Sequence, residues 1–394
     1  MPESSHVGSY EFFLPEELIA QDPPARRGDA RLLLVEPGLG AVAERTFRHL
    51  PDILRPGDLL VLNESRVLPA RLLTRRADTG GQVEILLIRP VPGDRTWLAL
   101  ARPQRRLRAG THLLIGQGNA PVVLEIAERR DQGEVLVTGA VDPAVMARKW
   151  GVMPLPPYIR RGPQDFVSER GRRDRRRYQT VFARPDDTGA GSVAAPTAGL
   201  HFSETVLGEL ADRGINTAKV SLHVGPGTFR APSPQQIRAQ RLHREYFRLP
   251  AETSAIVAAT WRAGGRVIAV GTTSLRVLES VARLDLPDSG PDRVVFGADG
   301  PAPPEFVGEA VRSDQHWEVC GETRLFLRPP DQVTSVDGLL TNFHLPGSSL
   351  LMLVATMTGE KIWPGIYAQA VEGRFRFYSY GDCMLILPGL KKGP

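Results

Sequence analysis

The segment Arg266-Val267-Ile268-Ala269-Val270-Gly271-Thr272-Thr273-Ser274-Leu275-Arg276 decides the fold. Its first part is a short, mostly apolar run typical of a buried strand, and the residues from Ser274 to Ala282 continue with helical periodicity. A strand that passes into a helix through a Gly-Thr-Thr turn is the repeating unit of α/β domains. We therefore expect an α/β domain with this turn at one edge of its sheet.

The same alternation of helix and strand continues on both sides of this segment. Ser203 can cap a helix that Gly214 ends, and a strand is expected over residues 219–224. Near the C-terminus, a strand over 338–343 precedes a nearly all-apolar helix over 348–358. A helix over 255–262 completes the pattern. It predicts an α/β/α layered domain, in which helices cover both faces of the sheet.

A different pattern occupies the segment from about residue 70 to 140. Turn residues separate short alternating runs over 81–88, 96–100, 122–126 and 134–137, as in a small antiparallel β-barrel. Residues 58–63 upstream again resemble a strand of the α/β domain. We therefore expect an inserted β-barrel domain over 70–150 and a catalytic α/β/α domain made of 1–69 and 151–394.

The composition of the 394 residues is that of an ordinary globular protein. The N-terminal residues lack the apolar run of a secretory signal, and no apolar stretch approaches the 20 or so residues that cross a bilayer. We expect a cytoplasmic protein, a monomer, with no membrane span and no metal. Cys320 and Cys383 are expected to be small buried apolar residues. Residues 184–190 and 287–292 are expected to be surface loops.

Arginine is concentrated in two clusters. Residues 160–177 hold eight arginines against three acids, an excess of five that equals the net charge of the whole chain. The residues that we expect to bind the phosphates of a polyanionic partner are Arg172, Arg173, Arg175 and Arg176 of this cluster and Arg102, Arg105 and Arg106 of the second one. The alternative is a solvated, arginine-rich surface.

Four segments place a histidine or a Thr-Thr pair in a small-residue turn at a strand–helix junction. They cover residues 194–202, 222–229, 269–276 and 340–349. Active sites of α/β enzymes lie at such junctions. Gly271-Thr272-Thr273 opens a helix whose free N–H groups suit an anion, although a plain Thr-capped turn is the alternative. Arg276, one turn into that helix, favours the anion site.

Candidates for proton transfer are His201, His223, His243 and His344, of which we expect one or two to act. Glu245 lies near His243, and a carboxylate there would favour the protonated imidazole. No GxxxxGK[ST], complete GxGxxG or GxSxG motif occurs. A P-loop ATPase, a nicotinamide or flavin enzyme and a serine acyl transferase are therefore not indicated.

Longer motifs identify a family resemblance. Besides the four turns, they cover residues 13–21, 56–63, 66–72, 155–159, 178–181 and 377–382. In their content and order, the chain resembles the bacterial S-adenosylmethionine:tRNA ribosyltransferase-isomerases of queuosine biosynthesis over nearly its whole length. The resemblance implies a β-barrel domain set into an α/β/α domain, as the pattern also predicts.

The resemblance implies transfer and isomerisation of the ribosyl group of S-adenosylmethionine onto 7-aminomethyl-7-deazaguanine at the wobble position of tRNA. The product would be epoxyqueuosine-tRNA, with adenine and methionine released. The sulfonium acidifies the ribose C5′, so a base must take that proton, and the departing adenine needs a proton donor. The four histidines are the candidates, in an order that stays open, with Glu245 and Asp382 as carboxylate candidates.

The resemblance also implies substrate contacts. Gly271, Thr272, Thr273 and Arg276 would bind the methionine carboxylate, and Phe229 or Tyr380 would face the sulfonium. Asn63, Arg66, Asn342 and Asp382 would bind ribose, adenine or the modified base, or hydrogen-bond turns. The other expected contacts are Arg71, Thr197, Gly199, Phe202, Gly225, Gly227, Thr228, Thr341 and Pro346. Competing functions are a S-adenosylmethionine-dependent tRNA methyltransferase and a non-catalytic RNA-binding module.

Overall fold

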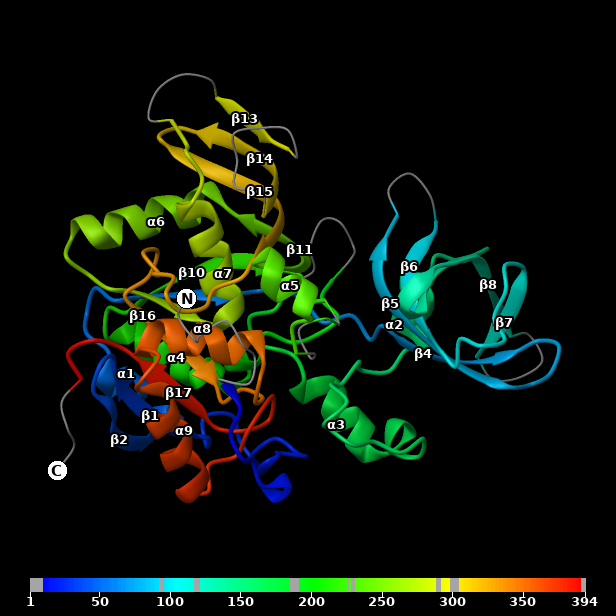
Figure 1. Ribbon diagram of the computed structural model, residues 1–394, viewed down its shortest axis with the longest axis horizontal. Helices are drawn as coiled ribbons and strands as arrows, with labels where there is room; N and C mark the ends of the chain where they lie inside the picture. Colours follow the sequence, from blue (N-terminus) through cyan, green and yellow to red (C-terminus); the bar gives the residue numbers. More distant parts are fainter. Residues whose placement is uncertain are drawn as a thin grey trace. The chain divides into compact units, whose positions relative to one another are not determined.

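The computed structural model divides the chain into two compact units (Figure 1). The sheet unit comprises Met1–Glu64, Thr180–Phe182 and Pro196–Pro394, and the barrel unit comprises Ser65–Gln179 and Ala183–Ala195. The structure describes residues 10–91, 95–116, 121–184, 191–225, 227, 231–287, 292–297 and 305–390. Each unit has its own buried apolar core.

The sheet unit is built on an eleven-stranded sheet with the order β13-β14-β15-β11-β10-β3-β12-β16-β17-β1-β2. The four central strands are parallel: β10 (Asn216–Leu222), β3 (Leu59–Asn63), β12 (Val267–Val270) and β16 (Gly338–Asn342). All residues of β3, β12 and β16 are buried, because this part of the sheet is covered on both faces.

Strands of mixed direction extend this centre on both sides. Next to β16 lie β17 (Cys383–Ile386), β1 (Arg31–Glu36) and β2 (Gly40–Thr46). Next to β10 lie β11 (Arg241–Leu249), β15 (His316–Leu325), β14 (Phe306–Ser313) and β13 (Arg293–Phe296), which are all antiparallel to their neighbours. The central parallel strands thus continue into an antiparallel sheet.

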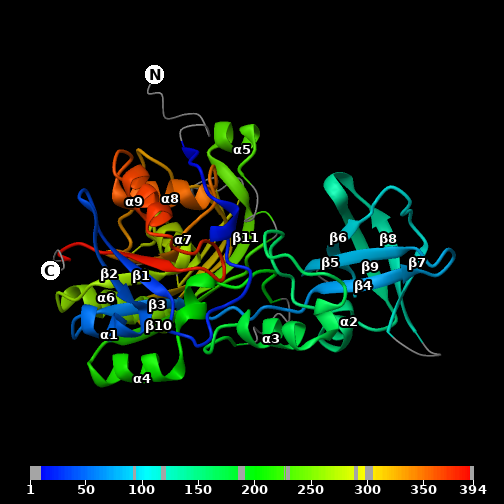
Figure 2. The ribbon, with the colours of Figure 1, turned by 90° about the horizontal axis from the view of Figure 1, so that it is seen from below.

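Helices lie on both faces of the central strands (Figure 2). One face carries α1 (Leu50–Ile53) and α4 (Glu204–Asp212), and the other carries α7 (Gly271–Ala282), α8 (Ser349–Thr358) and α9 (Trp363–Glu372). The short 3-10 helices η4 (Phe47–His49) and η7 (Thr197–His201) contribute residues to the same core cluster as α1 and α4. The remaining helices of this unit are η3 (Glu16–Leu18), α5 (Pro234–Ala239) and α6 (Ala251–Arg262). Helix α4 begins after Ser203, whose hydroxyl accepts the N–H of Val206 at 3.2 Å, and it buries Val206 and Leu210 against the sheet.

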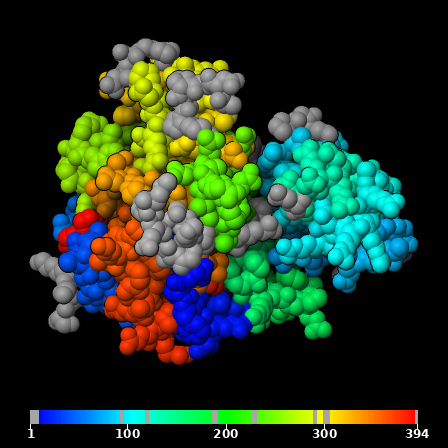
Figure 3. Space-filling model, in the orientation of Figure 1, coloured from blue at the N-terminus to red at the C-terminus, as the bar shows by residue number. Residues whose placement is uncertain are grey.

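The barrel unit contains a closed six-stranded barrel with the order β4-β5-β6-β9-β8-β7, drawn in blue to cyan in Figures 1 and 3. Its strands are β4 (Arg71–Arg76), β5 (Gln82–Pro90), β6 (Trp97–Arg102), β7 (Thr111–Ile115), β8 (Val122–Arg129) and β9 (Glu134–Gly139). Alternate side chains such as Leu72, Ile85 and Leu113 point inward and are fully buried. The helices of this unit are η5 (Asp131–Gly133), α2 (Pro143–Trp150), η6 (Asp165–Val167) and α3 (Glu169–Arg177).

The predicted fold class is confirmed: an α/β sheet domain with an inserted antiparallel barrel. The barrel unit is wider than the expected 70–150, because residues 65–69 and most of 151–195 pack with it. Residue 71 pairs with residue 152, for example, and α3 is tied to Arg161 within the same unit. The antiparallel extension of the sheet, made of β11, β15, β14 and β13, was not predicted from the sequence.

Smaller expectations have mixed outcomes. Cys383 is fully buried, as predicted, but Cys320 is only half-buried; neither forms a disulfide in the part of the chain that the structure describes. Most of the two predicted surface loops, 185–190 and 288–291, lies outside the described residues. Among the helices that are described, none is long and apolar enough to cross a membrane.

Candidate active site

Three of the four predicted turns follow the carboxyl ends of β10, β12 and β16, and η7 of the fourth turn reaches the end of β16 through His201 and Asn342. Among the parallel strands of the sheet, the next one in the chain after β3 is β10 and the next one after β12 is β16, and these two lie on opposite sides of the β3–β12 pair. Such a divergence between adjacent parallel strands is the position at which open α/β sheets bind ligands. The registers pair Leu62 with Val270 and Val270 with Leu340, so these strands end at nearly the same level.

A buried ion pair lies at this edge, between β11 and α7. Glu245 and Arg276 are 3% and 4% exposed, and the Arg276 Nη1 contacts Glu245 Oε2. The other carboxylate oxygen of Glu245 lies 3.0 Å from Nε2 of His243 and accepts the main-chain N–H of Gly225 at 3.0 Å. His243 and Glu245 are two residues apart on one strand and therefore share a face.

The charges of this cluster favour an ionised Glu245. Burial by itself raises the pKa of its carboxyl, but the positive charge of Arg276 and the hydrogen bonds from His243 and the Gly225 N–H oppose this and hold the pKa below its ordinary value. Arg276 keeps two buried nitrogens, Nε and Nη2, that have no hydrogen-bond partner among the described residues. The cluster thus orients an imidazole through a carboxylate and leaves donors of the guanidinium available to a ligand.

A second pair joins η7 to the end of β16. The amide nitrogen of Asn342 donates to the carbonyl of Tyr378 at 3.0 Å and lies 3.2 Å from Nε2 of His201. The Tyr378 carbonyl can only accept, so the atom that faces it is the amide NH2 group, which only donates. Nε2 of His201 therefore accepts the second hydrogen bond, and the proton of the neutral imidazole lies on Nδ1. Burial lowers the pKa of His201 to about 4, in agreement with a neutral ring. The buried Oδ1 of Asn342 has no partner within the described part of the chain.

His344 is held on the other face of β16. Its Nε2 lies 2.8 Å from the hydroxyl of Thr341, and its main-chain N–H donates to the hydroxyl of Tyr367 at 3.2 Å. Burial lowers the pKa of His344 to about 3. The side chains of Thr341 and Asn342 point to opposite faces of the sheet because they are consecutive in a strand. Their partners, His344 and His201, therefore lie on opposite faces.

The buried, neutral His201 predicts a pH dependence of folding. Between pH 6.5 and about 4 the unfolded chain binds a proton at this residue that the folded chain does not, so stability falls as the pH falls through this window. Between pH 7.5 and 4.5, we expect His201→Gln to lose about 3 kcal/mol less unfolding free energy than the unchanged protein loses. Urea unfolding at several pH values measures it.

The exposed His112 of the barrel provides the control for that experiment. His112→Gln is expected to show the pH dependence of the unchanged protein. An equal loss of stability in His201→Gln and the unchanged protein over this pH range would contradict a neutral, buried His201.

The turn at residues 271–273 forms the first turn of α7. Gly271 has φ 88°, which favours glycine, and no side chain caps the helix at Val270. The hydroxyl oxygen of Thr273 is buried and has no hydrogen-bond partner among the described residues. Free N–H groups at the start of a twelve-residue helix attract anions, so the predicted anion site stays a prediction with suitable geometry.

Several predicted substrate residues have partners within the protein. The Asn63 amide donates to the carbonyl of Leu222 at 3.0 Å and accepts its N–H at 3.2 Å, which ties β3 to β10. Phe202 is fully buried against Phe47. A Cβ on Gly199 would lie 2.8 Å from Thr180, so this glycine permits close packing. Their roles toward substrate stay predictions.

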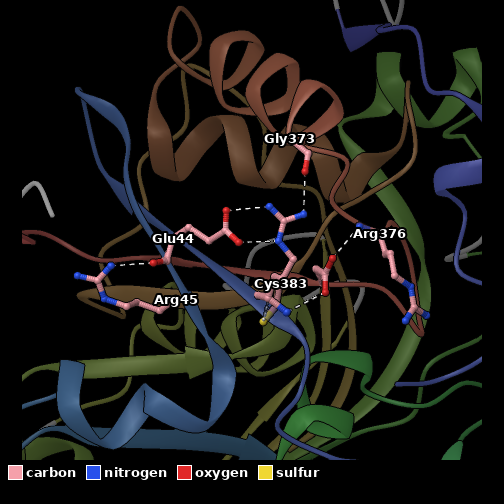
Figure 4. Close-up of polar contacts among 7 residues, drawn as sticks. Glu44, Arg45, Gly373, Arg376 and Cys383 are labelled. Carbon is pink, nitrogen blue, oxygen red and sulfur yellow. Dashed lines mark hydrogen bonds and ion pairs between the residues drawn. The ribbon is translucent and has the colours of Figure 1, made fainter. Parts of the chain in front are cut away.

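Asp382 joins two other segments of the sheet unit. Its two oxygens accept the main-chain N–H groups of Arg31 at 2.8 Å and Arg376 at 2.7 Å, and burial raises its pKa. Figure 4 shows the polar contacts around Arg376 and Cys383. Tyr380 is buried, and its carbonyl accepts a hydrogen bond from the Arg376 guanidinium. Contacts of Asp382 and Tyr380 with substrate stay predictions.

The remaining predicted residues are placed as follows. A Cβ on Gly227 would lie 2.6 Å from Nδ1 of His243, so this turn lies directly against the imidazole. His223 follows β10, and its ring lies 5.4 Å from that of Tyr246. Thr228 and Phe229 lie outside the described residues. Thr272 is buried, Thr197 and Pro346 are half-buried, and Arg66 and Arg71 belong to the barrel unit.

The arginines of the barrel unit differ in how exposed they are and in the bonds that they already form within the protein. Arg161 forms a buried bidentate pair with Asp174 at 2.7 and 3.1 Å. On the exposed side of α3, Glu169 pairs with both Arg172 and Arg176 at 2.8 Å. Arg175 is exposed but donates to the Gly151 carbonyl, and Arg173 is half-buried. Arg102, Arg105 and Arg106 are exposed on the barrel. Exposed guanidiniums therefore occur in both clusters.

Sequence reasoning missed Tyr378 and Tyr367, which hold Asn342 and His344 in place. Tyr378 has φ 71°, an uncommon conformation for a residue other than glycine. Its position inside the motif at 377–382 was a signal, because a residue of such a motif can also hold another site residue in place. Among the described residues, no three His, Cys, Asp or Glu side chains converge as a metal site.

Comparison with known proteins decides the family. The family model described as "Queuosine biosynthesis protein" matches residues 7–386. The chain belongs to this family. The resemblance predicted from the motifs is thereby confirmed.

Relatives of the family match the chain over nearly its full length. A protein of Gloeobacter violaceus is 42% identical over 97% of this chain and 96% of its own, and one of Anaeromyxobacter sp. is 43% identical over 96% and 98%. Both are named S-adenosylmethionine:tRNA ribosyltransferase-isomerase. A crystal structure of a Thermotoga maritima S-adenosylmethionine tRNA ribosyltransferase is 30% identical, covering 96% of this chain and all of its own, with a TM-score of 0.49.

Proposed function

We propose that the protein transfers and isomerises the ribosyl group of S-adenosylmethionine onto 7-aminomethyl-7-deazaguanine at the wobble position of tRNA. The products are epoxyqueuosine-tRNA, adenine and methionine. The observation that carries this proposal is membership of the queuosine biosynthesis family, with relatives of that name across nearly the whole chain. The cytoplasmic location, the monomeric state and the independence from metal stay predictions.

In this proposal, His243 moves the proton at the ribose C5′. The reaction needs a base there, because the sulfonium acidifies this position. The ionised Glu245 accepts a hydrogen bond from Nε2 of His243, which leaves the other ring nitrogen, Nδ1, to accept the proton. Carboxylates orient the histidine of other proton-transfer sites in the same way. Arg276 acts as a positioning residue because it keeps Glu245 charged.

The methionine and adenine parts of the substrate have suitable partners at the same edge. The carboxylate can accept from the uncapped N–H groups at the start of α7 and from Nε and Nη2 of Arg276. The exocyclic amine of adenine can donate to the buried Oδ1 of Asn342, and His201 lies beside it. Each group would satisfy a protein atom that now has no partner among the described residues.

The tRNA is held through its phosphates by the exposed arginines. The wobble base lies in a single-stranded loop, so it can enter a pocket without opening a duplex. We expect replacement of Arg172, Arg173, Arg175 and Arg176 by alanine to raise the KM for tRNA and to flatten its salt dependence, with kcat nearly unchanged. Initial rates at several salt concentrations measure both effects.

A control variant removes four exposed arginines from the sheet unit, namely Arg45, Arg213, Arg244 and Arg293. It loses the same formal charge, and its KM for tRNA is expected to change less. The same salt slope in the α3 variant as in the unchanged protein would contradict phosphate binding by this helix.

The experiment that tests the function is incubation of the purified protein with S-adenosylmethionine and tRNA carrying the 7-aminomethyl-7-deazaguanine base. Mass spectrometry is expected to detect adenine and methionine in equal amounts. The competing tRNA methyltransferase would form S-adenosylhomocysteine instead, and its appearance would refute the proposal. Tight tRNA binding without any turnover would leave the non-catalytic RNA-binding module.

A further inference from the structure

The outer face of the barrel carries a groove whose lining residues all belong to the barrel unit. It has a volume of about 700 Å³, and the barrel strands that carry it belong to the part drawn in blue to cyan in Figure 3. Strands β4, β5 and β6 form its floor, and residues 161–166 contribute one wall. The volume falls in the range of about 300–1,000 Å³ in which proteins bind small ligands.

The charges in the groove are unequal. Four arginines line it, but Glu84 is the one acid among its lining residues. Arg161 is committed to Asp174, and Arg71 lies 3.4 Å from Glu84. Arg75 and Arg102 are the two lining arginines without an ion-pair partner in the described part of the chain. The groove therefore carries two positive charges that are not compensated.

These two arginines belong to one continuous surface. The registers align Leu73 with Glu84 and Glu84 with Arg102 across the three strands, and Arg75 is two residues from Leu73 on the same face. Neighbouring strands are about 4.8 Å apart, so Arg75 and Arg102 come from strands about 10 Å apart. This separation lets each guanidinium contact a different phosphate of one nucleotide chain.

Apolar surface lies between these charges. Leu73 points outward from its barrel strand and is 44% exposed. Phe166 is half-buried in the opposite wall. An unstacked base packs well on an aromatic ring and an aliphatic side chain, whereas the paired bases of a duplex cannot reach them. The combination of guanidiniums and an aromatic wall is that of a groove for single-stranded nucleic acid.

We propose that this groove binds unpaired nucleotides of the tRNA, with phosphates on Arg75 and Arg102 and a base against Phe166. The inference rests on the proposed function for its choice of RNA. It adds a second tRNA contact, besides the arginines of α3, that reads the single-stranded state of the RNA rather than its charge alone.

Binding of tRNA in the absence of S-adenosylmethionine tests the groove separately from catalysis. The affinity of labelled tRNA is measured by fluorescence anisotropy from low to high salt. Arg75→Gln/Arg102→Gln is expected to raise Kd about tenfold and to reduce the salt slope by about 1.4, the value for two lost contacts to a single strand. Phe166→Ala is expected to raise Kd about tenfold with the slope unchanged.

The matched control is Arg89→Gln/Arg129→Gln, which removes two exposed arginines of the same barrel outside the groove. Equal Kd values and salt slopes for the groove pair and this control pair would overturn the proposal, as would competition by an acidic peptide as effective as that by RNA of equal charge. Failure of the proposed function would give a different result: the unchanged protein would release no adenine, whether or not the groove variants bind tRNA weakly.

Discussion

Replacing His243 with asparagine is expected to lower kcat by about 10²- to 10⁴-fold, the contribution typical of a positioned acid or base. The side chain of His243 is 27% exposed, whereas the Glu245–Arg276 pair beneath it is buried and keeps its own contact. The fold should therefore survive, and the KM for tRNA should change little. Single-turnover rates at saturating substrates measure the loss.

The control for this experiment is His49→Asn, a change at an exposed histidine of the sheet unit. It is expected to keep the rate of the unchanged protein. A His243→Asn variant that reacts as fast as this control would remove His243 from the mechanism and leave His201, His223 and His344 as candidates.

Removing the positive charge of Arg276 is expected to destabilise the sheet unit strongly. Arg276→Met leaves the Glu245 carboxylate buried without its guanidinium partner, a change that costs about 3–5 kcal/mol of unfolding free energy in buried ion pairs. Glu245→Gln/Arg276→Met removes both charges, so it should be more stable than Arg276→Met alone. Urea unfolding at pH 7 of the two single variants and the double variant measures the coupling.

The outcome of this cycle separates two views of the pair. If the losses of the single variants simply add in the double variant, the two side chains do not interact in solution as the structure shows. Coupling of several kcal/mol supports the role of Arg276 in keeping Glu245 ionised beneath His243.

Local signals made part of the fold predictable. The apolar run of β12 and the turn at Gly271 identify a strand–helix unit, and Ser203 marks the start of α4, because capping and periodicity depend on neighbouring residues. The antiparallel extension was missed because it depends on pairing between distant segments. β11 carries charged residues on its exposed face and pairs with β15, about 75 residues further along the chain.

The site was predictable to a similar degree. The motifs pointed to His201, Asn342 and Arg276, and the structure brings all three to the carboxyl edge of the sheet. The sequence could not show that Arg276 would pair with Glu245, since that contact joins α7 to β11, the strand of the antiparallel extension that adjoins β10. Nor could it show that Asn63 hydrogen-bonds to the main chain of a neighbouring strand.

The central claim is that the ribosyl group, not the methyl group, of S-adenosylmethionine reaches the tRNA. Its most direct test uses two preparations of S-adenosylmethionine, one labelled in the ribose and one in the methyl group, with tRNA that carries the 7-aminomethyl-7-deazaguanine base. The account predicts ribose label in the tRNA and methyl label in free methionine. Methyl label in the tRNA, with ribose label left in S-adenosylhomocysteine, would contradict it.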